Sequence, residues 1–326
     1  GTNNYMGITF EPSAIAAGKK ALDDFGTGTT GSRIANGSYA MHKELERELA
    51  KFLNRKHCIV FTTGYQANLG MISGLAGARD TVYLDADSHS SIYDGCTLSG
   101  AKLVRFRHND AADLDKRLSR SEGEEGGKLV VLEGIYSMLG DRAPLKDFVE
   151  LKRKHNFQLL VDEAHSFGVL GPHGRGLADE AGLEAEADFV VGTFSKSIGS
   201  IGGFVAGNKD VIHYIKHKSR AFMFSASLPP ASAATVLECV KVIQEEPTLV
   251  DRLWKNARKM KQGFEDLGFD TMGTQTPVIP ILIGDDLKAF MFVKRLYELG
   301  VFATPVVSPA VPKGYALIRT SYMSTH

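Results

Sequence analysis

The strongest constraint on the fold is a series of short apolar runs that alternate with amphipathic stretches. The segment HKELERELAKFLNR places Leu45, Leu49 and Phe52 on one helical face, and the apolar run CIVFTT follows it. Further strand-like runs occur at 81–86, 102–107, 128–134, 158–164, 188–194 and 202–207. Buried strands that alternate with helices predict an α/β fold, with helices on both faces of a mostly parallel sheet.

The pattern changes near residue 240. Two long helical segments, at about 229–246 and 248–267, precede the strand-like runs VIPILIG and YALIRTS. We predict an N-terminal segment (1–25) that contacts the substrate, a large cofactor-binding domain (26–245) and a smaller C-terminal α/β domain (246–326). The chain starts abruptly at GTNNYMG and stops abruptly at SYMSTH, so we expect the N-terminal arm and the end of the small domain to be truncated.

Composition and charge exclude several classes of protein. Lys plus Arg and Asp plus Glu both total 38, so no overall field favours nucleic acid or an anionic membrane. Cys58, Cys96 and Cys239 are widely spaced, which argues against a disulfide framework or a cysteine-based zinc site. No apolar run approaches the ~18 residues of a membrane span. We therefore predict a cytoplasmic protein with no transmembrane segment, no nucleic-acid partner and no metal.

Three motifs match functions that the rest of the chain does not support. GTGTTG (26–31) fits the dinucleotide pattern GxGxxG, but it follows a helical segment instead of a strand. DEAH (162–165) occurs in helicases, which also need a GxxxxGK[ST] phosphate loop that this sequence lacks. HYIKH (213–217) has no adjoining glutamate, so a solvated helix face is favoured over a zinc site.

A different chemistry is indicated by four strand ends taken together. Lys196 follows one strand, Asp162 ends another, TGYQAN (63–68) joins a strand to a helix, and His89 follows a fourth. Alone, each has an ordinary explanation, such as a plain turn, a strand-end cap or a packed histidine. Pyridoxal phosphate needs a Schiff-base lysine, a carboxylate at the pyridine nitrogen, amides and hydroxyls for the phosphate, and a flat side chain over the ring. The set predicts this cofactor.

The chain resembles the α-oxoamine synthases, a family of fold type I pyridoxal phosphate enzymes, over essentially its whole length. The matching blocks, in the family's order, are NNYMG, GSRIANGSYAMHKELE, TTGYQANLG, LDADSHSSIYDG, VRFRHND, LEGIYSMLGD, LVDEAHSFG, GTFSKSIG and SASLPP. The resemblance implies an acyltransferase that joins a small amino acid to an acyl-CoA with loss of CO2. It also implies a homodimer whose active site is shared between the subunits.

The resemblance further implies roles for individual residues. Lys196 is expected to form the Schiff base, Asp162 to face the pyridine nitrogen, and His165 to bind the phenolic oxygen of the ring. His89 is expected to stack on the ring and to orient the substrate carboxylate. Other implied cofactor contacts are Gly64, Tyr65, Ser137, Thr193 and, from the other subunit, Ser225 and Ala226. The substrate carboxylate is expected at Asn4 and Arg319, and Arg319 can bind it bidentately.

Two features bear on the substrates. Ser195 in GTFSKS favours the branch of the family that condenses L-serine with palmitoyl-CoA to 3-ketodihydrosphingosine in sphingolipid synthesis. The loop TPVVSPAVP, however, has Val306 and Val307 where this branch has an arginine, and it resembles the loop of the branch that uses glycine and acetyl-CoA. Glycine with acetyl-CoA and alanine with pimeloyl-CoA therefore stay open. A catalytically silent partner subunit is a further alternative, against which Lys196, Asp162 and His165 together argue.

Overall fold

Seven strands form the larger of two sheets in this computed structural model, which describes residues 2–326. Only β7 runs in the direction opposite to the other six strands, so the prediction of a mostly parallel α/β sheet is confirmed. The order across the sheet is β1 (His57–Phe61), β7 (Gly203–Gly207), β6 (Phe189–Thr193), β5 (Gln158–Asp162), β4 (Lys128–Glu133), β2 (Thr81–Asp85) and β3 (Lys102–Phe106).

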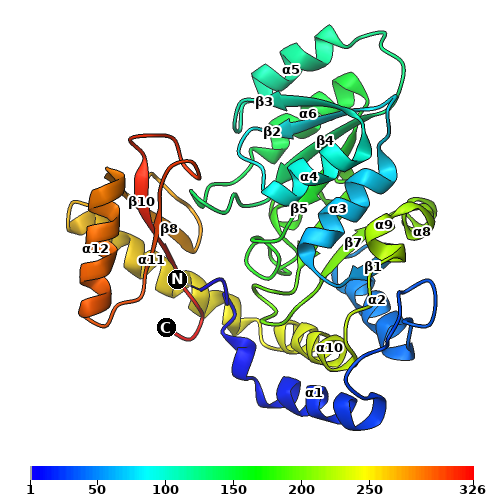
Figure 1. Cartoon of the computed structure of the whole chain (residues 1–326). Coiled ribbons are helices and arrows are strands. Elements are labelled where there is room, and N and C mark those ends of the chain that lie inside the picture. The colour runs from blue at the N-terminus through cyan, green and yellow to red at the C-terminus, as the bar shows by residue number, and fades with distance from the viewer. Residues whose placement is uncertain (1) are drawn as a thin grey trace.

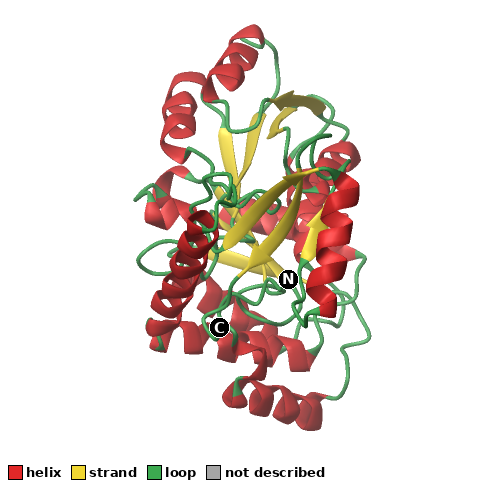
Figure 2. Ribbon diagram, turned by 90° about the vertical axis from the view of Figure 1, so that its left-hand side faces the viewer, coloured by secondary structure: helices red, strands yellow, loops and turns green. Residues whose placement is uncertain are grey.

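Both faces of this sheet are covered by helices, as Figures 1 and 2 show. Alternate strand residues enter opposite cores: Leu159 and Val161 of β5 enter one, and Leu160 enters the other. This two-sided burial explains why the strands read as continuous apolar runs. One face carries α2 (Ala40–Phe52), α5 (Ala111–Arg120), α6 (Leu145–His155) and α10 (Pro230–Glu245), and the other carries α3 (Gly64–Leu75), α4 (Ser90–Ser99), α8 (Lys209–Lys218) and α9 (Arg220–Met223).

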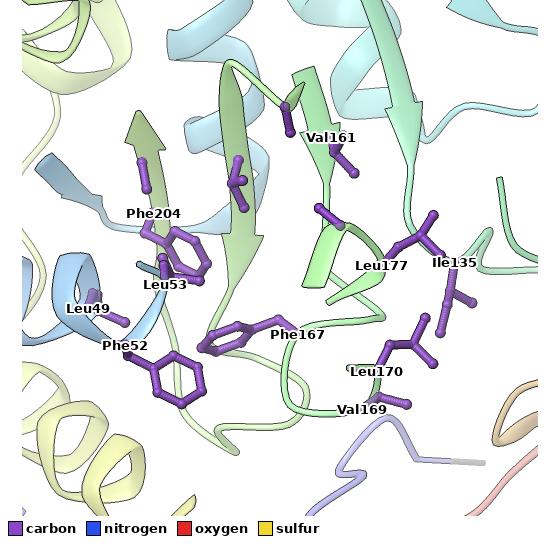
Figure 3. Packing of buried hydrophobic residues seen from close by; sticks show 14 of the residues in the cluster. Leu49, Phe52, Leu53, Ile135, Val161, Phe167, Val169, Leu170, Leu177 and Phe204 are labelled. Carbon is purple, nitrogen blue, oxygen red and sulfur yellow. The ribbon is translucent and has the colours of Figure 1, made fainter. Parts of the chain in front are cut away.

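Aromatic packing anchors the loop that follows β5 (Figure 3). The ring of Phe167 lies edge-on to Phe52 and to Phe204 of β7, with centroid separations of 5.5 and 5.2 Å. Such edge-to-face contacts stabilise a particular arrangement of the rings in addition to burying apolar area. Because Phe167 lies two residues after His165, this packing also holds the DEAH segment against the sheet.

A smaller antiparallel sheet lies to one side of the larger one (Figure 1), in the order β8 (Val278–Gly284), β10 (Ala316–Ser321) and β9 (Thr304–Val306). It packs on α11 (Thr248–Asp266) and α12 (Asp286–Glu298). The sequence predicted α11, β8 and β10, whereas α12 and the three-residue β9 were not among its predicted elements. The division into domains at residues 245 and 246 stays a prediction.

The N-terminal segment joins the two sheets. Its α1 (Pro12–Phe25) packs on α10, and the residues before α1 lie against the end of β10. The amide of Ser324 donates to the carbonyl of Tyr5 (2.8 Å), and the Ser324 hydroxyl donates to that of Met6 (2.6 Å). In Figure 1 the two chain ends accordingly lie close together beside β10. The remaining short elements are η1 (Ile8–Phe10), α7 (Leu177–Glu180) and η2 (Glu184–Glu186).

A buried ion pair protects the edge of the larger sheet. Strand β1 is one of its two edge strands, and the amide and carbonyl of Val60 face away from β7 toward Glu46 and Arg33. Glu46 accepts from the Val60 amide (3.0 Å), and Arg33 donates to the Val60 carbonyl (3.1 Å). The Arg33 and Glu46 side chains are themselves 2.8 Å apart and almost fully buried.

We predict that Arg33→Ala lowers the free energy of unfolding by about 3 kcal/mol, because it leaves the Glu46 carboxylate buried without its charge partner. Urea denaturation would measure the change. The matched control is Arg47→Ala on the same helix as Glu46, where the ion pair with Glu48 is exposed, and its cost should stay below about 1 kcal/mol. Equal costs for the two substitutions would contradict the role of the buried pair.

Candidate active site

The candidate site is a cavity of about 340 Å³ at the carboxyl ends of β4, β5 and β6 and the start of α3. Ligands of open α/β sheets bind at this edge. Seven of the residues predicted from the sequence line the cavity: Gly64, Tyr65, His89, Asp162, His165, Thr193 and Lys196.

Lys196 enters the cavity from the loop that follows β6. Burial lowers the pKa of its amine from 10.5 to about 8, although the negative charges of Asp162 and Glu133 partly oppose the shift. Roughly a tenth of this amine is therefore uncharged at pH 7, far more than for an ordinary lysine, and the uncharged form is the one that acts as a nucleophile or a base.

Asp162 ends β5 and is buried. One of its oxygens accepts from the side-chain amide of Asn68 (2.6 Å), and the other accepts from the backbone amide of Ala164 (2.9 Å). A buried carboxylate requires such donors. Asp162 therefore both caps the turn after its strand and presents negative charge to the cavity.

His89 is the residue before α4, and its ring tautomer can be inferred from its partners. The backbone amide of Ser91, which can only donate, points at Nδ1 (3.2 Å), so the ring proton lies on Nε2. Burial lowers the pKa of His89, which keeps the ring neutral. The Ser91 hydroxyl contacts both Nδ1 (2.8 Å) and the Asn68 amide (3.0 Å), so a chain of hydrogen bonds runs from His89 to Asp162.

His165 follows Asp162 by three residues, and its ring is also neutral. Burial, together with the positive charges of Lys196 and Arg319, holds the pKa of His165 well below its ordinary value. Its Nδ1 is 2.7 Å from the hydroxyl of Tyr5, whose own pKa burial raises to about 12. Tyr5 therefore keeps its proton, and its hydroxyl shares a hydrogen bond with the neutral imidazole whose donor is set by the tautomer of His165.

The start of α3 is shaped for a close backbone contact. A Cβ atom at Gly64 would lie 2.7 Å from Cβ of Thr193, so only glycine fits there. Thr63 caps the helix by accepting from the Gln66 amide, while the amides of Gly64 and Tyr65 have no acceptor within residues 2–326. Free amides at a helix N-terminus, with the Thr193 hydroxyl beside them, form an anion site suited to a phosphate.

Comparison with known proteins is consistent with this geometry. The family model for aminotransferases of class I and II matches residues 1–326. The chain belongs to that family.

Similar proteins in this family include α-oxoamine synthases of two kinds. A serine palmitoyltransferase of Caulobacter vibrioides is 51% identical over 326 residues, which are all of this chain and 81% of that protein. An 8-amino-7-oxononanoate synthase of Symbiobacterium thermophilum is 41% identical over 325 residues, covering 100% of this chain and 83% of that protein. A solved structure of Sphingomonas wittichii serine palmitoyltransferase superposes with a TM-score of 0.97 at 50% identity, over 100% of this chain and 82% of that one.

Five residues predicted for the site lie outside the cavity lining. The carbonyl of Ser137 accepts from Arg319 (2.7 Å), whose guanidinium also donates to Asn3 (3.1 Å). Asn4 donates to Thr9 (2.9 Å). Ser225 accepts from Gln66 (2.7 Å) and the carbonyl of Ala226 accepts from Thr62 (2.6 Å), so both lie beside the start of α3 of their own chain. The roles implied for Ser137, Asn4, Arg319, Ser225 and Ala226 stay predictions.

Several site residues were missed from the sequence. Asn68 and Ser91 lie inside motifs that the analysis used, but their contacts depend on two helices meeting in space. Tyr5 contacts His165, which lies 160 residues further along the chain. Glu133 ends β4 and lines the cavity. Its position at the end of a predicted strand is the sequence signal that could have identified it.

One cluster of polar groups outside the cavity has a structural explanation. Asp85, Asp87 and His108 could hold a metal by their spacing, but both ring nitrogens of His108 already face carboxylates, Asp85 at 2.8 Å and Asp141 at 2.6 Å. Burial lowers the pKa of His108, but these hydrogen bonds outweigh it and raise the pKa to about 10, so the ring is a cation and not a metal ligand.

His213 and His217 are exposed on α8, as predicted. Of the helices formed by residues 2–326, none has the length and apolar character needed to cross a bilayer.

We predict that Lys196 of the cofactor-free chain reacts with an amine-selective acylating reagent at half its maximal rate near pH 8, since only the uncharged amine reacts. Peptide mass spectrometry across a pH series would measure this. The exposed Lys20, whose pKa is raised by its hydrogen bond to Asp24, should reach half its maximal rate only above pH 10. A Lys196 profile that coincides with that of Lys20 would contradict the predicted pKa.

Proposed function

We propose that this chain is a pyridoxal phosphate-dependent acyltransferase that condenses L-serine with a long-chain acyl-CoA such as palmitoyl-CoA, releasing CoA and CO2. The product would be 3-ketodihydrosphingosine. The observation that carries the proposal is the convergence of Lys196, Asp162 and the free amides of α3 on one cavity. Similarity to serine palmitoyltransferases over the whole chain supports the choice of substrates.

The residues of the cavity fit the cofactor. Lys196 would hold it covalently, Asp162 would face its pyridine nitrogen, and the amides of Gly64 and Tyr65 with the Thr193 hydroxyl would hold its phosphate. When bound, pyridoxal phosphate supplies an aldehyde that links to amines and a ring that accepts negative charge from the substrate. His165 would form a hydrogen bond with the ring oxygen.

Proton transfer is the work of Lys196 and His89. With a pKa of about 8, the Lys196 amine can remove the Cα proton of the amino acid and later return it. Neutral His89 presents its Nε2 proton to the cavity, where it can donate to the substrate carboxylate or to the thioester oxygen of the acyl-CoA.

The amino-acid carboxylate would bind at Arg319 with help from Asn4. The Arg319 guanidinium is oriented by Ser137 and Asn3 and lies near enough to the cavity to lower the pKa values of Lys196 and His165. A guanidinium held in this way can bind a carboxylate with two parallel hydrogen bonds. The amine, the Cα proton and the carboxylate of serine would then each face a fitting group.

We further propose that the protein acts in the cytoplasm as a homodimer. Ser225 and Ala226 of one subunit would reach the phosphate of the other, as the family resemblance implies. Within one chain, Ser225 contacts Gln66 and Ala226 contacts Thr62, and both contacts are at the N-terminal end of α3, which faces the cavity.

A second set of substrates is favoured by one feature, the loop that includes Val306 and Val307. Val306 of β9 packs in a small core with Val311 and Leu317, so this loop has an apolar side chain where the serine-using branch of the family has an arginine. This favours glycine with acetyl-CoA as the alternative pair. Alanine with pimeloyl-CoA is a third, supported by the similarity to 8-amino-7-oxononanoate synthases.

We predict that Lys196→Ala abolishes the borohydride-stable attachment of pyridoxal phosphate and lowers turnover by at least about a thousandfold, because it removes both the covalent anchor and the base. Absorbance of the reduced protein and release of CoA would measure the two effects. The matched control is Lys209→Ala, at a residue that follows the end of β7 at the opposite edge of the sheet from the cavity, and it should leave both unchanged. Turnover retained by Lys196→Ala would rule out the proposed mechanism.

We predict that L-serine, among L-serine, glycine and L-alanine, gives the largest change in the absorbance of the bound cofactor. Palmitoyl-CoA, among palmitoyl-, acetyl- and pimeloyl-CoA, should give the fastest release of CoA. A spectral change confined to glycine, with CoA released from acetyl-CoA alone, would replace the serine assignment by the glycine one.

A further inference from the structure

Glu133 is a buried carboxyl group of the cavity that the proposed chemistry has not used. It ends β4 directly beside Asp162, its register partner at the end of β5. Its Oε1 accepts the backbone N–H of His89 at 2.5 Å. Because His89 precedes the first turn of α4, this bond fixes the loop from which the imidazole enters the cavity.

The charges around Glu133 decide where the protons of the site lie. It faces Asp162 on β5, Lys196 after β6, His89 before α4 and, more distantly, Asp85 on β2. Burial first, and then the negative charge of Asp162, raise the pKa of Glu133 to about 8, although the His89 amide and Lys196 oppose the shift. Two adjacent buried carboxyls do not both ionise cheaply, and Asp162 is the one with two N–H donors.

We propose that Glu133 is a positioning residue: its carboxyl holds the backbone of His89, and in its neutral form it leaves the negative charge of the site on Asp162. The inference rests on the proposed function for its catalytic consequence. The contact itself, in which the carboxyl at the end of β4 accepts from the amide of the residue before α4, does not depend on that function.

Two substitutions separate the parts of this role. Glu133→Gln keeps an oxygen that accepts from the His89 amide and imitates the neutral carboxyl, so kcat and KM for L-serine should stay within about threefold of the unsubstituted enzyme. Glu133→Leu has similar bulk but leaves the His89 amide without its acceptor. It should lower kcat/KM by about tenfold or more, because a buried donor is left unpaired and His89 loses its position.

A measurement independent of turnover tests the contact directly. In the full chain labelled with 15N-histidine, the His89 backbone amide should shift with pH around a midpoint near 8, both as the chain is purified and after removal of pyridoxal phosphate. The signal is assigned by its loss in His89→Gln. Because Lys196 titrates in the same range, the comparison is made in Lys196→Ala, where the shift should persist with Glu133 present and vanish with Glu133→Gln, while the other histidine amides provide the internal control.

The outcomes distinguish this inference from the proposed function. A His89 amide that does not change between pH 6 and 9.5, or a Glu133→Leu variant with unchanged kcat and KM, would overturn the role of Glu133. If Glu133→Leu does not fold, the amide titration and Glu133→Gln still decide. If no amino acid and acyl-CoA pair is turned over while the His89 amide titrates and Glu133→Gln abolishes the shift, the proposed function fails and the positioning contact stands.

Discussion

The buried carboxylate of Asp162 is the interaction on which the rest of the site depends. Its two hydrogen bonds come from Asn68 and Ala164, and Asn68 in turn meets Ser91, which contacts His89. A charge of this kind is tolerated in a protein interior only if its donors are fixed in place. These hydrogen bonds align α3, α4 and the loop after β5 around Asp162, and the cavity lies between these elements.

Burial in the cavity also gives a basic group and an acidic group similar pKa values. Burial moves the pKa of Lys196 down and that of Glu133 up, each to about 8. At the same time burial keeps His89 and His165 neutral, and the ring proton of His89 lies on Nε2. A site that holds few fixed charges, and whose acids and bases titrate near neutral pH, is well suited to proton transfer.

The alternation of apolar and amphipathic stretches predicted the sheet, and polar residues at the ends of predicted strands indicated part of the cavity lining. Parallel strands end at the same edge, so Asp162, Lys196 and His89, each near a strand end, had to approach one another. Contacts that depend on the relative placement of whole elements could not be found in this way. Tyr5 meets His165 only because the N-terminal segment crosses to the large sheet, and Arg319 reaches Ser137 from the small sheet.

The ion pair of Arg33 and Glu46 has a consequence beyond the stability of one chain. Exposed strand edges can recruit a strand from another molecule, because their outward amide and carbonyl groups have no partner. At Val60 both groups are already bonded to side chains of the same molecule. A strand that approached β1 from outside would find no free donor or acceptor at this position, so the pair acts as a barrier to disordered self-association of the sheet.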